Sequence, residues 1–128
     1  MIKKSLKNFK QSIRSQDGFV VTAELAAGPG YRFKPISSFL SRFCEVGYEP
    51  IPSSFNFCAV TIPQSPGGVS NIEPFDVLDR VSDENLLGGL DFIPHITCKD
   101  HNKTALSSLL VGYRDREVES VLALTGDK

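Results

Sequence analysis

A regular alternation of apolar and amphipathic segments constrains this chain more than any other feature. Continuous apolar runs bounded by Gly and Pro predict buried strands, and apolar residues spaced at helical intervals predict helices between them. A strand, a helix and a second strand in succession form a right-handed crossover between parallel strands. The predicted strands are 19–25, 55–62, 92–98 and 120–125, and the predicted helices are 36–47, 72–81 and 104–116.

Two α/β architectures fit this order. One is a small doubly wound parallel sheet, and the other is the first half of an eight-stranded (β/α) barrel. A complete barrel of that kind needs about 250 residues, whereas this chain has 128. Periodicity alone favours neither architecture.

The sequence predicts a separate N-terminal amphipathic helix at residues 1–17 and an α/β domain at residues 18–128. The apolar stripe of the helix consists of Ile2, Leu6, Phe9 and Ile13, and its opposite face is basic. The formal net charge of the whole chain is −1, which gives no general electrostatic reason to bind nucleic acid or an anionic membrane. The sequence has no apolar run of membrane-spanning length.

The cysteines indicate a reducing compartment. Three cysteines are too few for a secreted disulfide scaffold, so we expect a cytoplasmic protein. Cys44 and Cys58 stand in apolar stripes and are expected in the core. His95, Cys98 and His101 have a spacing that suggests zinc, but residues three apart on a strand point to opposite faces. No metal site is therefore predicted.

Polar residues stand near the carboxyl end of each predicted strand: Glu24, Thr61, the segment 95–100 and Asp127. In both architectures ligands bind at this edge of the sheet. Glu24 directly follows apolar strand residues, so we expect its carboxylate to be partly desolvated and able to act as a general acid. The alternative is a structural pair between Glu24 and a nearby Arg or Lys. Pro66-Gly67-Gly68 is expected to form a turn rather than a phosphate-binding loop.

Two motifs in the second half of the chain resemble one enzyme family. Pro94-His95-Ile96-Thr97-Cys98-Lys99-Asp100 and Val121-Leu122-Ala123-Leu124-Thr125-Gly126-Asp127 are similar to the P-H-[LI]-T-C-x-D and [VL]-A-L-x-G-D motifs of flavin-dependent methylenetetrahydrofolate reductases. The segment 19–24 resembles the first strand of that family, which ends in its acidic catalytic residue. Val60-Thr61 resembles the end of the second strand.

The resemblance implies the amino-terminal half of a (β/α)8 TIM barrel, truncated at its C-terminus. It also implies FAD as cofactor, NAD(P)H as co-substrate and reduction of 5,10-methylenetetrahydrofolate to 5-methyltetrahydrofolate in one-carbon and methionine metabolism. Glu24 would protonate N10 of the folate as the catalytic acid. Thr61 and His95 would contact the flavin or the nicotinamide, Thr125 and Gly126 would line the flavin, and Asp127 would lie near the flavin pyrimidine and the bound pterin.

The chain departs from the family pattern at two places. Leu25-Ala26 follows Glu24 where the family has Pro-Pro, and Thr125 stands where several relatives carry Arg. The later barrel strands are also missing, so we expect no activity from this chain alone, and a homo-oligomer or a partner subunit for the complete enzyme. Two alternatives stay open: another folate-binding barrel, such as a pterin-dependent methyltransferase, and a small non-catalytic α/β binding module.

Overall fold

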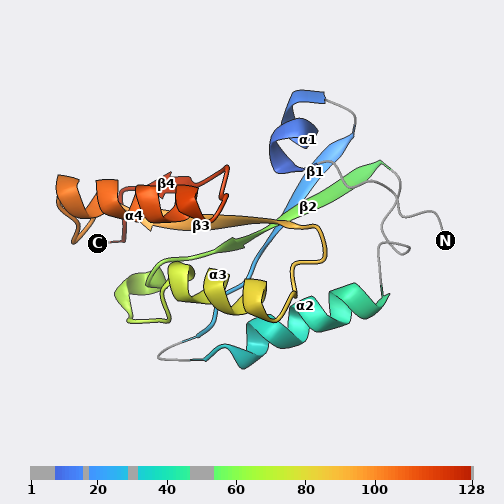
Figure 1. Cartoon of the computed structure of the whole chain (residues 1–128), viewed down its shortest axis with the longest axis horizontal. Helices are drawn as coiled ribbons and strands as arrows, with labels where there is room; N and C mark the ends of the chain where they lie inside the picture. Colours follow the sequence, from blue (N-terminus) through green and yellow to red (C-terminus); the bar gives the residue numbers. More distant parts are fainter. Residues whose placement is uncertain (1–7, 16–17, 29–31, 47–53, 128) are drawn as a thin grey trace.

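The fold alternates strands and helices as the sequence predicts (Figure 1). The computed structural model describes residues 8–15, 18–28, 32–46 and 54–127. The helices are α1 (Phe9–Ser15), α2 (Lys34–Val46), α3 (Pro74–Asp83) and α4 (Lys103–Asp115), with a 3₁₀ turn η1 (Pro66–Gly68). The strands are β1 (Phe19–Glu24), β2 (Phe55–Ile62), β3 (Asp91–Thr97) and β4 (Leu122–Leu124).

The four strands form one sheet in the order β1-β2-β3-β4, and every pairing is parallel. The predicted parallel sheet is thus confirmed. A doubly wound sheet reverses its strand order at a switch point, and this sheet does not, so the doubly wound alternative is wrong. The curled sheet is a half-barrel in shape.

Helices α2, α3 and α4 cover one face of the sheet, which we call the outer face. The main apolar core lies between them and the sheet. It includes Leu40 of α2, Val77 of α3 and Tyr113 of α4, together with Val60 of β2 and Phe92 of β3. Because all three crossover helices lie on the same face, the opposite, inner face of the curled sheet is left for α1 and for the polar strand ends.

Helix α1 covers the amino-terminal part of the inner face. Phe9 packs against Cys58, Ala59 and Ile93, and its backbone N–H donates a hydrogen bond of 2.7 Å to Oδ2 of Asp91. The predicted apolar stripe of this helix is only partly right, because Ser12 is buried while Ile13 is exposed. Ile2 and Leu6 of that stripe, like part of the predicted segment 1–17, lie outside the described residues.

Two other burial predictions are corrected by the structure. Cys44 is exposed rather than in the core, and its thiol donates to the carbonyl of Leu86 at 3.5 Å. Phe39, which falls on the apolar stripe of the predicted helix 36–47, is also exposed, whereas Phe43 of the same stripe packs edge-on against Phe57 with the ring centroids 4.8 Å apart. Cys58 is buried as predicted, and burial raises the pKa of its thiol.

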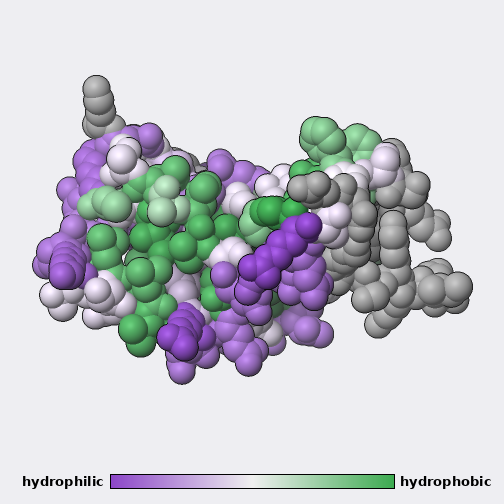
Figure 2. All heavy atoms as spheres, turned by 90° about the horizontal axis from the view of Figure 1, so that it is seen from above, coloured by the Kyte–Doolittle hydropathy of each residue, from purple (hydrophilic) through white to green (hydrophobic). Residues whose placement is uncertain are grey.

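The β4 side of the molecule presents apolar side chains to solvent. Leu122 and Leu124 of β4 are exposed, as are Leu110 and Val111 of the neighbouring helix α4. Figure 2 shows hydrophobic side chains gathered over the β4–α4 region, with hydrophilic residues around them. In the described part of the chain, no helix combines the length and the hydrophobicity needed to cross a membrane.

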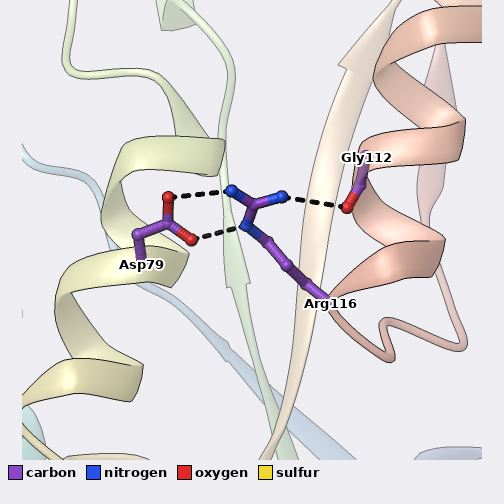
Figure 3. Close-up of polar contacts among 3 residues, drawn as sticks. All are labelled: Asp79, Gly112 and Arg116. Atoms are coloured by element: carbon purple, nitrogen blue, oxygen red, sulfur yellow. Dashed lines mark hydrogen bonds and ion pairs between the residues drawn. The ribbon is translucent and has the colours of Figure 1, made fainter.

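Arg116 holds α4 against α3 (Figure 3). Its guanidinium donates two hydrogen bonds to the Asp79 carboxylate, of 2.5 and 3.2 Å, and a third of 3.3 Å to the carbonyl of Gly112. The same guanidinium lies 3.9 Å from the centre of the Phe75 ring. The hydrogen bonds from Arg116 to the Asp79 carboxylate lower the pKa of Asp79.

Gly112 of α4 lies against the ring of Phe75 of α3. A Cβ atom there would lie 2.8 Å from Cε2 of Phe75, whose ring is confined by Tyr113 and Arg116. We predict that Gly112→Ala lowers the free energy of unfolding by about 1 kcal/mol, because the clash outweighs the gain in helix propensity. Urea denaturation measures the change, with Ser107→Ala on the exposed side of α4 as control. A stabilised Gly112→Ala chain would contradict this packing.

The Asp79–Arg116 pair predicts a pH-dependent contribution to stability. A carboxyl group with a lowered pKa in the folded state stabilises the fold above its unfolded pKa, about 3.9, and loses this contribution as the pH falls through the folded pKa. Asp79→Asn should therefore be less stable than the wild type at pH 7. The two midpoints of thermal unfolding should converge below about pH 4. Asp83→Asn, on the same helix, is the control, and a pH-independent Asp79→Asn effect would count against the pair.

Candidate ligand site at the carboxyl ends of the strands

A cavity of about 470 Å³ opens at the carboxyl ends of the strands. Its volume is within the range of small-molecule sites, about 300–1,000 Å³. The residues around it come from the ends of β1, β3 and β4 and from the loops that follow β2, β3 and β4. Five of the six predicted site residues line it: Glu24, His95, Thr125, Gly126 and Asp127.

Glu24 and His95 face each other in this cavity. Glu24 is the last residue of β1, His95 lies in β3, and Oε2 of the carboxylate is 3.8 Å from Nε2 of the imidazole. The Glu24 side chain is 59% exposed, so the expected desolvation by the strand is wrong. The expected alternative was a pair with Arg or Lys; among the described residues the group that faces Glu24 is instead the histidine His95.

The imidazole of His95 is buried, with only 6% of the residue exposed. Its Nε2 atom is also buried and has no hydrogen-bond partner among the residues that the structure describes. Burial lowers the pKa of His95, and the nearby Glu24 charge raises it to a smaller extent. Burial thus disfavours the charged ring, and the described part of the chain leaves Nε2, which lies 3.8 Å from the Glu24 carboxylate, without a hydrogen bond.

Thr61 is the one predicted site residue that does not line the cavity. It is buried, and it pairs in register with Glu24 on one side and with Ile93 on the other. Because residues in register on neighbouring parallel strands lie on the same face, Thr61 stands on the inner face between the strands that carry Glu24 and His95. It supports the floor of the site rather than its wall.

Asp127 lines the cavity where the loop after β4 contacts the turn η1. Its carboxylate Oδ2 accepts a hydrogen bond of 2.7 Å from the N–H of Gly67, and its carbonyl accepts one of 2.7 Å from Nζ of Lys99. Gly126 has φ of 102°, and a Cβ atom there would lie 2.6 Å from Cβ of Lys99. Glycine is thus required at Gly126 by the backbone and by the close approach of Lys99.

Sequence reasoning assigned no role to Gln64, which is the buried hub of the site. Its amide group donates to Oε2 of Glu73 at 3.0 Å. Its side-chain oxygen accepts from the N–H of Thr97 at 2.9 Å and from the Thr97 hydroxyl at 3.0 Å. Its position in the sequence could have indicated this role, because Gln64 closely follows the predicted strand 55–62 at the same edge of the sheet as Thr61.

The side chains of His95, Cys98 and His101, whose spacing in the sequence suggests zinc, do not converge on a common point. Nδ1 of His101 lies 3.1 Å from the carbonyls of Thr97 and Lys99, and Cys98 is exposed. Among the residues that the structure describes, no group of three or more His, Cys, Asp or Glu side chains is arranged to hold a metal ion.

Gln64 gives a direct test of how the site is held together. We predict that Gln64→Leu lowers the free energy of unfolding by about 2 kcal/mol, because the N–H and hydroxyl of Thr97 lose their shared acceptor. Urea denaturation measures the change, and Gln11→Leu is the matched control, because the Gln11 side chain is exposed and accepts a long hydrogen bond of 3.3 Å from the exposed N–H of Asn8. Equal stability of the wild-type and Gln64→Leu chains would contradict the role of Gln64 as a hub.

Comparison with models of protein families, with curated proteins and with solved structures finds no match. What the site does is therefore inferred from its own residues and from the motif resemblance.

Proposed function

We propose that this chain is the amino-terminal half of a (β/α)8 barrel of the methylenetetrahydrofolate reductase type. The proposed enzyme is cytoplasmic and reduces 5,10-methylenetetrahydrofolate to 5-methyltetrahydrofolate with FAD and NAD(P)H. One observation carries the proposal: the cavity at the carboxyl ends of the strands is lined by Glu24, His95, Thr125, Gly126 and Asp127. These residues belong to segments that the motif resemblance selects independently of the structure.

The residues present fit a flavin in three respects. The cavity volume, about 470 Å³, is that of a small-molecule site. The unsatisfied Nε2 atom of His95 offers a polar contact inside it. Thr125 and Gly126, which the resemblance places against the flavin, line the cavity wall. In the proposed enzyme His95, Thr125 and Gly126 contact the flavin or the nicotinamide, and Thr61 supports them from the cavity floor.

Glu24 supplies the acid chemistry of the proposed reaction. Its carboxyl group donates a proton to N10 of the folate, the bond between N10 and the bridging carbon breaks, and the bonding electrons pass to N10. The carbon is left as an iminium joined to N5, and Glu24 is left as a carboxylate. FAD, held by His95, Thr125 and Gly126, would supply the hydride chemistry that reduces that carbon, with NAD(P)H as the source of the hydride. A folate stacked over the cavity would remove Glu24 from water and so favour its uncharged, proton-donating form.

Flavin binding is the experiment that tests the proposal. The family barrel has eight strands and this sheet has four, so the readout is binding rather than turnover. FAD titrated with the purified chain should show saturable quenching of flavin fluorescence. We predict that Thr125→Arg tightens binding by about fivefold, because it adds a charged partner for the flavin phosphates at the edge of the cavity.

The matched control is Thr104→Arg, which adds the same charge on the exposed start of α4. It should leave the FAD dissociation constant unchanged. Absence of any saturable flavin binding would contradict the proposal. Binding of methyltetrahydrofolate without FAD would favour the pterin-dependent methyltransferase alternative, and binding of neither would favour a non-catalytic module.

A further inference from the structure

The buried Nε2 atom of His95 is a polar group whose partner has to be explained. Burying a nitrogen without a hydrogen bond costs free energy. Such an atom therefore indicates a hydrogen-bond partner that is present only when a neighbouring group is protonated or a ligand is bound. Oε2 of Glu24 lies 3.8 Å from this nitrogen. That separation is an ion-pair contact, slightly too long for a hydrogen bond.

The other charged groups around the cavity are engaged elsewhere or act less directly. Nζ of Lys99 donates to the carbonyl of Asp127, and the Asp127 carboxylate accepts from the turn at Gly67. Asp100 lines the cavity from the loop after β3. From β2, the strand between β1 and β3, the neighbouring residue in register is the neutral Thr61. Glu24 is the charged group whose field acts on His95.

We infer that Glu24 and His95 hold a single proton between them and act as one proton-donating unit. The inference deepens the proposed function and rests on it for the identity of the proton acceptor. With the proton on Glu24, a small rotation of its exposed side chain shortens the 3.8 Å separation, and its O–H donates to Nε2 of His95 and satisfies that buried atom. With the proton on His95, Nε2–H points at the carboxylate. His95 is thus a positioning residue, which holds the acid proton at the mouth of the cavity.

The exposure of the two groups fixes the direction of proton flow. Glu24 is exposed and His95 is buried, so the pair takes up its proton from water through Glu24 before a ligand covers the cavity. Covering the site with a flat ligand then penalises separated charges and favours the form with a neutral carboxyl and a neutral imidazole. Transfer of the proton from Glu24 to the substrate nitrogen leaves the pair as carboxylate and neutral imidazole, and water reloads it after the product leaves.

Proton NMR of the imidazole rings tests the shared proton in the chain without flavin or folate. The chain has two histidines, so two sets of ring signals are followed against pH, and His101→Gln assigns them. Burial lowers the pKa of His95, and the Glu24 charge partly offsets this effect. We predict that Glu24→Gln moves the His95 midpoint to still lower pH, while the His101 midpoint stays in place.

Asp100→Asn is the matched control, because it removes a carboxylate from the same cavity at a left-handed position that asparagine tolerates. It should leave the His95 midpoint unchanged. Glu24→Asp, with its shorter side chain, should give a midpoint between those of the wild type and Glu24→Gln, and it serves if the glutamine variant does not fold. An unchanged or raised His95 midpoint in both Glu24 variants would overturn the inference. Because the titration needs no flavin, a chain that fails to bind FAD leaves its result intact.

Discussion

The parallel pairing of β1, β2 and β3 is the interaction on which the rest of the structure depends. Each strand ends at the same edge of the sheet, so the pairing alone brings together side chains from distant parts of the sequence. Glu24 stands in register with Thr61, Thr61 with Ile93, and His95 with Leu122. A shift of one residue in any of these pairings would turn the polar strand ends from the inner face to the apolar core.

An irregularity in that pairing decides which side chains meet. Between Val21 and Thr22 the register with β2 skips Cys58, so Thr22 pairs with Ala59 and Glu24 with Thr61. Without this bulge Glu24 would stand beside the outer-face residue Val60. The extra residue, Cys58, is absorbed on the inner face under Phe9 of α1. The small helix at the start of the chain thus packs over the bulge that sets the register of the candidate acid.

The sequence was sufficient for what depends on local pattern and insufficient for what depends on neighbours in space. Apolar runs located all the strands, and strand-end position selected Glu24, His95 and Asp127, which line one cavity. The exposure of Glu24 was predicted wrongly, because it depends on what covers the inner face at the end of β1. Gln64 was missed since its role comes from Glu73 and from Thr97 on another strand. Cys44 was wrongly predicted to lie in the core, because periodicity identifies the apolar side of a helix but does not show which part of that side other elements cover.

Sequential parallel strands bring Glu24 and His95 to one edge of one sheet. Nuclear Overhauser contacts between backbone protons of neighbouring strands test it most directly, in the isotopically labelled chain. The account predicts contacts between Glu24 and Thr61, between Thr61 and Ile93, and between His95 and Leu122, as the register requires. Contacts between β1 and β3, with none between β1 and β2, would show a different strand order and would contradict the account.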